Sequence, residues 1–291
     1  MSKVIVLLRG GLGNQLFNYA AGFRLAHFAE AELILDNVTF FKNDYGFNRY
    51  YLLDRFCISG RVASKHERLL ISSRFGRYMA KRVNEILPFR YRWYIAEESL
   101  EYDPRLLHKK VRKSLFLDGY WQSEEYFRDV SDLIKEEFRL KIGEEDVNSS
   151  LCDKIMGTNS VCIHVRWFSN PPENRGNSPV RYYNNALEFI RRHVDNPFFF
   201  VFTDNIYLTK GHLKIPRDNV EYIGNPDKDP CHDFWLMTQC KHFIIANSTF
   251  SWWAAWLAQN HGKIIIAPKV QISGMGAWGF NGLIPRGWYL I

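Results

Sequence analysis

Residues 242–257 read HFIIANSTFSWWAAWL. A short apolar run at residues 243–246 leads directly into Asn247, Ser248 and Thr249, and a tryptophan-rich helix follows at once. A helix that starts where a buried strand ends leaves several backbone N–H groups and the positive end of its dipole free. Hydroxyls and an amide gathered at that point make an anion site. We therefore expect this segment to bind a phosphorylated ligand.

The second half of the chain alternates apolar strands with helices. We expect strands at residues 161–165, 198–202, 220–223, 243–246 and 263–267, and helices at residues 180–194, 230–240 and 249–259. Uniformly apolar strands that are separated by helices indicate a parallel sheet covered on both faces. The second half is therefore predicted to be a doubly wound α/β domain.

The first half opens with the same pattern. We expect strands at residues 4–8, 33–35 and 114–117, a helix from about residue 14 to residue 30, and another at residues 124–138. Residues 37–93 are aromatic and basic and give no clear assignment. Residues 141–160 are small and polar, which is typical of a domain boundary. We divide the chain into domains of residues 1–150 and 151–291.

The composition indicates an ordinary globular protein. The chain has 291 residues, of which 46% are hydrophobic and 24% charged, so it can form a core. No apolar run approaches the ~20 residues needed to cross a bilayer. The apolar residues before Arg9 are too few for a signal peptide, and the five cysteines form no C-x-x-C pair. These features predict a cytoplasmic protein with reduced thiols.

The net charge of +7 is concentrated in residues 61–92, which contain nine Lys or Arg residues and only two acidic residues, Glu67 and Glu85. A solvated basic face explains this, and a patch that meets anionic lipid or nucleic acid is the alternative. No zinc-finger or RNP-like pattern supports nucleic acid. An amphipathic helix at the inner membrane face is physically feasible, because several apolar residues share one helix face. These residues are Leu69, Leu70, Phe75, Met79, Val83 and Leu87.

Polar residues follow successive strands of the second half, and ligands bind beyond the carboxyl ends of such strands. In chain order they are His164 and Arg166, then Thr203, Asp204 and Asn205, then Gly224 and Asn225, and finally Asn247, Ser248 and Thr249. A guanidinium at the mouth of an apolar sheet needs an anionic partner, and no acid lies near Arg166 in sequence. Pairing with a phosphate satisfies that need. Asp204 could instead cap the next helix, and His164 could be structural.

The glycine turn at residues 10–13 suggests a dinucleotide site, but Leu16 stands where the third glycine of G-x-G-x-x-G belongs. We prefer a tight turn that directs Arg9, Asn14 and Gln15 into a cleft between the halves. The triplet Asp227-Lys228-Asp229 matches a metal-binding D-x-D, but it precedes Pro230 at a helix start, which favours capping. No cluster of His, Cys and carboxylates has the spacing of a metal site.

Five motifs resemble those of the bacterial alpha-1,2-fucosyltransferases of glycosyltransferase family 11. They are GGLGNQLFNYA (10–20), GYWQSEEYF (119–127), CIHVR (162–166), FTDN (202–205) and ANSTFSWWAAWLA (246–258). The resemblance covers almost the whole chain. It implies a GT-B fold, in which two Rossmann-like α/β domains face each other across a cleft, with the acceptor on the first and GDP-fucose on the second. It further implies inverting transfer to the 2-hydroxyl of a galactoside, in surface polysaccharide or O-antigen synthesis, without metal or cofactor.

The same resemblance gives roles to individual residues. Arg166 matches the arginine on the donor diphosphate, and His164 is its motif partner. Ser248, Thr249 and Phe250 match the donor-binding segment, to which Thr203, Asp204 and Asn247 are added as strand-end neighbours. Asn14 and Gln15 match the loop that faces the transferred sugar, and Arg9 and Gln122 are expected beside them on the acceptor side.

One departure concerns the usual H-V-R-R-G-D pattern. Here Arg166 is followed by Trp167, Phe168, Ser169 and Asn170, so the second arginine and the aspartate are missing. Three other functions stay open: transfer of another GDP-sugar or formation of another fucose linkage, a nicotinamide oxidoreductase built on the glycine turn, and a non-catalytic glycan-binding protein.

Overall fold

The computed structural model describes residues 1–42, 48–141, 143, 149–168, 176–224, 229–274 and 276–291. The chain folds as two compact units. Unit 1 comprises Met1–Arg139 together with Asn281–Leu283, and unit 2 comprises Leu140–Phe280 together with Ile284–Ile291. We expected the division at residue 150. In the structure the chain divides after Arg139, and Asn281–Leu283 also belong to unit 1.

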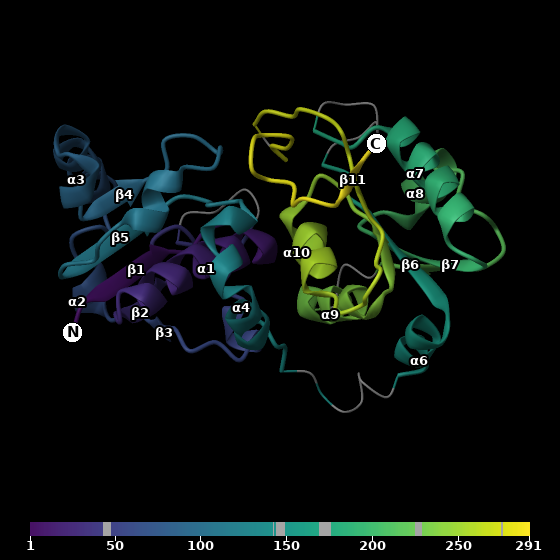
Figure 1. Cartoon of the computed structure of the whole chain (residues 1–291), viewed down its shortest axis with the longest axis horizontal. Helices are drawn as coiled ribbons and strands as arrows, with labels where there is room; N and C mark the ends of the chain where they lie inside the picture. The colour runs from purple at the N-terminus through teal and green to yellow at the C-terminus, as the bar shows by residue number, and fades with distance from the viewer. Residues whose placement is uncertain (43–47, 142, 144–148, 169–175, 225–228, 275) are drawn as a thin grey trace. The chain divides into compact units, whose positions relative to one another are not determined.

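Unit 1 contains a five-stranded parallel sheet with the order β3-β2-β1-β5-β4 (Figure 1). The strands are β1 (Lys3–Leu7), β2 (Glu32–Asp36), β3 (Arg61–Val62), β4 (Tyr94–Ala96) and β5 (Ser114–Asp118). The strands predicted near residues 4–8, 33–35 and 114–117 are confirmed. β3 and β4 are too short for apolar periodicity to reveal them, so the sequence missed both.

Helices cover both faces of this sheet. α1 (Leu12–Phe28) packs on one face, where Gly22 allows close approach to Val6. On the other face, Ile71 and Ala80 pack with Ile5, Leu7 and Tyr94 in one core cluster. The remaining helical segments are α2 (Lys65–Arg68), α3 (Arg74–Ile86), α4 (Ser131–Glu137) and the 3-10 turns Leu53–Arg55, Phe89–Tyr91, Pro104–His108, Glu124–Tyr126 and Arg128–Val130.

Two predicted helices of unit 1 have different limits in the structure. The helix expected at residues 124–138 consists of two 3-10 turns and then α4, because Phe127 adopts φ −146° and interrupts the helical backbone. The amphipathic helix expected around residues 69–87 is α3 alone. Leu69 and Leu70 lie in the turn before α3, and Leu87 ends it with an extended backbone.

Unit 2 contains a six-stranded parallel sheet with the order β11-β10-β9-β6-β7-β8. Its strands are β6 (Asn159–Val165), β7 (Pro197–Thr203), β8 (Val220–Ile223), β9 (His242–Ile244), β10 (Ile265–Ala267) and β11 (Tyr289–Leu290). α7 (Val180–His193) and α8 (Ile206–His212) cover one face, and α6 (Ser150–Gly157), α9 (Pro230–Gln239) and α10 (Thr249–Leu257) cover the other (Figure 1). The doubly wound prediction is confirmed. α6, α8 and β11 were not predicted.

Alternation along β6 determines which side chains reach the site. Val161, Ile163 and Val165 point into the core beneath α7. His164 therefore points to the opposite face, where its ring centroid lies 5.7 Å from that of Phe250 in α10. Within the described part of the chain, no helix is both long and apolar enough to cross a bilayer.

Candidate active site

Three neighbouring strands of unit 2 bring the predicted donor residues to one edge. β6 pairs with β7 on one side and with β9 on the other, all in parallel. Adjacent strands lie about 4.8 Å apart, so the segments that follow them are close neighbours. Arg166 follows β6, Asp204 follows β7, and residues 247–250 follow β9. This edge is where a doubly wound sheet binds its ligand.

Arg166 has a protein partner, which corrects the expectation that only a phosphate could pair with it. Its Nη1 lies 2.9 Å from Oδ2 of Asp204, and Oδ1 of Asp204 accepts the backbone N–H of Trp167 at 3.2 Å. The acid is distant in sequence but adjacent across the sheet, so sequence proximity could not reveal it. A guanidinium has five N–H donors, and its half-exposed position leaves room for an anionic ligand as well.

Asp204 therefore does not cap α8. Asn205 is the N-cap residue, since its Oδ1 accepts the backbone N–H of Leu208 at 3.0 Å. Burial raises the pKa of Asp204 above its usual value, although Arg166 and the Trp167 N–H act against this. Thr203 is buried, and its hydroxyl is hydrogen-bonded to that of Thr209 at 2.9 Å. This contact ties the end of β7 to α8.

His164 is a neutral buried group. It is 8% exposed, and burial together with the nearby Arg166 charge lowers its pKa to about 3. Its Nδ1 is buried and has no hydrogen-bond partner among the residues that the structure describes. His164 can therefore donate or accept a hydrogen bond, but it cannot supply a positive charge near neutral pH.

At the start of α10, one residue is buried and holds the turn, and the next three are partly accessible to solvent. Asn247 is buried: its Oδ1 accepts the Ser178 hydroxyl at 2.8 Å, and its Nδ2 donates to the carbonyls of Gly176 at 2.8 Å and Gly276 at 3.1 Å. Those contacts fix the turn and occupy the Asn247 amide. Ser248 is the N-cap of α10, and residues 248–250 are only half-buried. The Ser248 Oγ accepts the backbone N–H of Phe250 at 3.4 Å, as an N-cap side chain does. The prediction that the start of α10 binds an anion stays a prediction.

The D-x-D triplet lies mostly outside the described residues, as do Asn225, Ser169 and Asn170. Its last member, Asp229, caps α9 by accepting the backbone N–H of Cys231 at 3.0 Å. This agrees with the capping explanation. Within the described ranges, no three His, Cys, Asp or Glu side chains gather as metal ligands.

The carboxyl edge of the unit 1 sheet carries a second polar cluster. Arg9 forms an ion pair with Asp118, which also accepts the hydroxyl of Tyr94. The Arg9 guanidinium lies 3.9 Å from the ring centroid of Phe40, and burial lowers its pKa. Arg9 is therefore neutralised and held in place by its own unit.

Asn14 and Gln15 have different roles in the structure. Gln15 is fully buried: its Nε2 donates to the carbonyls of Gly10 at 3.0 Å and Tyr50 at 2.9 Å, and its Oε1 accepts the Leu52 N–H at 3.0 Å. Gln15 therefore holds a loop and does not point into open space, contrary to our expectation. Asn14 is half-buried and accepts a 2.8 Å hydrogen bond from Nε2 of Gln122.

A dinucleotide site at the glycine turn would need an acidic residue at the end of the second strand that is free to bind a ribose hydroxyl. Asp36, which ends β2, is fully buried. Its Oδ1 accepts the N–H groups of Val38 and Thr39, both at 3.0 Å, and its Oδ2 accepts the Thr39 hydroxyl. Because the carboxylate is occupied by its own turn, it has no access to a ribose hydroxyl.

The sequence missed two residues of this edge, Asn18 and Glu97. Asn18 is buried and joins the glycine turn to the β5 loop, accepting the Arg9 N–H at 3.1 Å and donating to the Gly119 carbonyl at 2.9 Å. The Glu97 carboxylate accepts the N–H groups of Tyr120 at 2.7 Å and Trp121 at 2.8 Å, and burial raises its pKa. Glu97 directly follows the short apolar run of β4. That run was the one sequence signal that could have placed Glu97 at the end of a strand.

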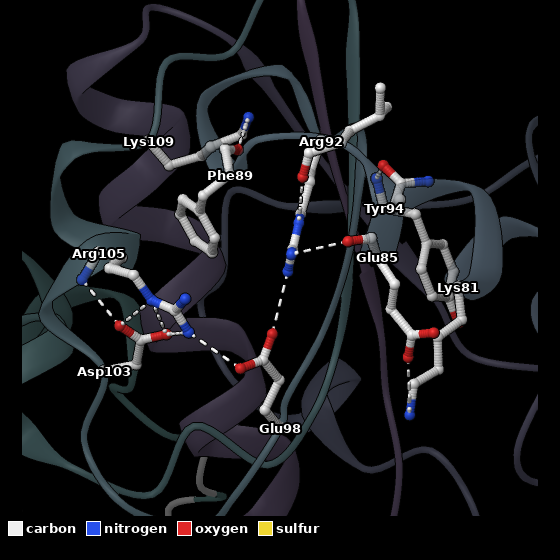
Figure 2. Close-up of polar contacts among 11 residues, drawn as sticks. Lys81, Glu85, Phe89, Arg92, Tyr94, Glu98, Asp103, Arg105 and Lys109 are labelled. Atoms are coloured by element: carbon white, nitrogen blue, oxygen red, sulfur yellow. Dashed lines mark hydrogen bonds and ion pairs between the residues drawn. The ribbon is translucent and has the colours of Figure 1, made fainter.

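A cavity of about 220 Å³ opens beside Glu97. Its walls include the aromatic side chains of Tyr102, Trp121 and Tyr126 and the carboxylates of Glu97 and Asp103. At its rim, Glu98 accepts hydrogen bonds from Arg92 at 3.0 Å and Arg105 at 3.1 Å (Figure 2). The Trp121 Nε1 is buried and has no hydrogen-bond partner in the described chain. Aromatic faces beside carboxylates suit the apolar faces and hydroxyls of a sugar ring.

The chain is similar to known glycosyltransferases. Residues 3–275 match the sequence model of a protein family, which is described as Glycosyl transferase family 11. An alpha-1,2-colitosyltransferase of Escherichia coli is 32% identical over 276 residues, covering 92% of this chain and 92% of that protein. The O-antigen biosynthesis glycosyltransferase WbnK of Escherichia coli is 27% identical, with 92% and 94% covered. The crystal structure of NodZ alpha-1,6-fucosyltransferase soaked with GDP-fucose has the same fold, with a TM-score of 0.53, 15% identity and 88% and 92% covered.

Proposed function

Because the chain belongs to glycosyltransferase family 11 and has a GT-B fold, we propose that it transfers fucose from GDP-fucose to the 2-hydroxyl of a galactoside, with inversion. An acceptor in O-antigen or another surface polysaccharide is part of the proposal. One observation carries it. Arg166 and the accessible start of α10 follow adjacent parallel strands, at the edge where such a sheet binds nucleotides.

The leaving GDP is stabilised by groups of unit 2. Arg166 donates to the diphosphate with the N–H groups that Asp204 leaves unused, while Asp204 fixes the direction of the guanidinium. The N-terminal N–H groups of α10 and the hydroxyls of Ser248 and Thr249 supply further donors. Preorganised donors of this kind are each worth about 3–4 kcal/mol in a transition state. No metal is needed in this scheme.

The acceptor is assigned to unit 1. The cavity beside Glu97 offers an aromatic wall, and the Glu97 carboxylate has lone pairs beyond those used by two backbone N–H groups. Sugar hydroxyls can donate to those lone pairs, and the buried indole N–H of Trp121 can donate to a sugar oxygen. Asn14, held by Gln122, is assigned to the transferred sugar.

A second candidate is transfer of a colitosyl group. The similarity to an alpha-1,2-colitosyltransferase supports it, because that protein is matched over nearly its whole length. Both candidates use the diphosphate site in the same way. They differ in the sugar that the site accepts, so a comparison of donors separates them.

The test is a transfer assay with defined donors. The purified chain is incubated with GDP-fucose or GDP-colitose, EDTA and a panel of beta-galactosides, and the linkage of each product is assigned by NMR. We expect an alpha-1,2-linked fucosyl galactoside. Preferred transfer from GDP-colitose would support the second candidate. Release of GDP from neither donor, or binding of NADH in place of GDP, would contradict the proposed function.

A further inference from the structure

α3 has its apolar side on the outside of unit 1. Phe75, Met79, Val83 and Ile86 lie on one side of the helix at i, i+4, i+8 and i+11, and we call them the outer face of α3. They are 73%, 43%, 46% and 86% exposed, respectively. Exposed apolar residues on this scale in one place mark an interaction surface.

The inner side of α3 explains why this orientation is fixed. Ala80 and Asn84 are buried against the sheet. The Asn84 side-chain oxygen accepts the backbone N–H groups of Trp93 at 2.7 Å and Tyr94 at 3.0 Å, so a polar residue anchors the helix to the edge strand β4. A surface helix ordinarily buries its apolar stripe and exposes its polar one. Here the arrangement is reversed. α3 packs against unit 1 through Ala80 and Asn84, so its apolar outer face stays exposed when unit 1 folds.

Exposed cations lie on the same helix, along one flank of the outer face. Arg74, Lys81 and Arg82 are exposed on α3, and Glu85 is the one acid of the helix, lying 3.3 Å from Arg82 and 4.0 Å from Lys81. Figure 2 shows the side chains of Lys81 and Glu85 next to each other, with their ion pair as a dashed line. Leu69 and Leu70, in the turn before α3, are also exposed, at 65% and 57%.

We infer that the outer face of α3 docks on an anionic lipid bilayer. Apolar side chains of an interfacial helix enter the acyl boundary while flanking Lys and Arg meet lipid phosphates. A second copy of the chain would bring two sets of cations together, which opposes self-association. Nucleic acid would leave the apolar residues without a partner, because its contacts are mainly to phosphates. The inference concerns unit 1 alone and does not rest on the proposed transfer reaction.

The experiment is flotation of the full chain with vesicles of phosphatidylcholine alone or mixed 3:1 with phosphatidylglycerol. We expect binding to the anionic vesicles that weakens as salt is added. The double variants F75S/I86S and K81E/R82E are each expected to bind at least tenfold more weakly. Matched controls are Y207S, which removes an 87% exposed aromatic side chain from α8, and R191E/R192E, which reverses two charges on α7; both should bind like the unaltered chain.

Circular dichroism establishes that each variant is folded, and transfer to a water-soluble acceptor should be unchanged in all of them. The inference is overturned if the unaltered chain does not float with anionic vesicles, or if the outer-face variants float as well as the controls. It is also overturned if sedimentation velocity shows a dimer that F75S/I86S abolishes, or if the charge variants instead lose binding to RNA.

Discussion

Arg166 and Asn247 illustrate, at the scale of single residues, the difference between a group that is available to a ligand and one that is not. Arg166 is held by Asp204 at 2.9 Å yet remains half-exposed, so it is oriented and accessible. Asn247 is buried and its amide is occupied by three neighbours. Both residues follow strand ends. Only the three-dimensional contacts show that one side chain is accessible and that the other is occupied by its own neighbours.

His164 predicts a pH dependence of stability. Its pKa is about 3 in the folded chain and 6.5 when unperturbed, because burial disfavours the charged imidazole. Between these values the unfolded chain binds more protons at this site, so the free energy of unfolding falls by about 1.4 kcal/mol per pH unit as the pH drops below 6.5. Urea unfolding at several pH values should show a weaker acid dependence in His164→Gln. An unchanged slope, equal to that of the exposed-site control His66→Gln, would contradict this.

The elements of the chain differ in how well sequence predicts them. β6, β7 and β8 were found within two residues because long apolar runs between helices have few other interpretations. β3, β4 and β11 have two or three residues each and no periodicity to detect. The position of Arg166, Asp204 and residues 247–250 at one edge of the sheet was predictable, because each follows a parallel strand. The Arg166–Asp204 pair and the role of Glu97 were not, because both depend on contacts across the sheet.

The start of α10 supports a prediction about Asn247. Asn247→Ala removes hydrogen bonds to Ser178, Gly176 and Gly276, and should lower the free energy of unfolding by about 2–4 kcal/mol. It should also raise the Kd for GDP, because the turn before Ser248 loses its support. Urea unfolding and calorimetry measure the two effects. Asn184→Ala, which loses one exposed hydrogen bond to Lys214, should have little effect on either.

The start of α1 supports a second comparison. Gln15→Ala should lower the free energy of unfolding by about 2–3 kcal/mol, because the buried Leu52 N–H and the part-buried carbonyls of Gly10 and Tyr50 lose their partner. Asn14→Ala should leave stability nearly unchanged and lower kcat more than tenfold. Parallel unfolding and transfer assays check the contrast. Equal effects of the two substitutions on kcat and on stability would show that the roles are not separated in this way.

The whole molecule is not two consecutive pieces of chain. Asn281–Leu283 belong to unit 1, where the Tyr102 N–H donates to the Asn281 carbonyl at 3.2 Å. Gly282 has φ +87°, and a Cβ there would lie 2.7 Å from the Cβ of Tyr102. A division at residue 150 misses this return segment, because three residues carry no sequence pattern that assigns them to the first unit.

Gly282→Ala tests the importance of the return segment. We expect it to lower the free energy of unfolding by about 2–3 kcal/mol, from strain at positive φ and from the clash with Tyr102. Gly287→Ala is the matched control, since Gly287 has φ +88° and no described atom within 4 Å of an added Cβ. Calorimetric unfolding should therefore show a larger loss for Gly282→Ala. Equal losses would mean that only backbone strain matters.

The central claim is that Arg166 neutralises the leaving diphosphate. The most direct measurement is the turnover of Arg166→Ala with GDP-fucose and a beta-galactoside, beside Lys154→Ala, which breaks an exposed ion pair with Glu221 elsewhere in unit 2. We predict a fall in kcat of about 100-fold or more for Arg166→Ala, with an unchanged circular dichroism spectrum, and near-normal turnover for Lys154→Ala. Near-normal turnover of a folded Arg166→Ala would contradict the account.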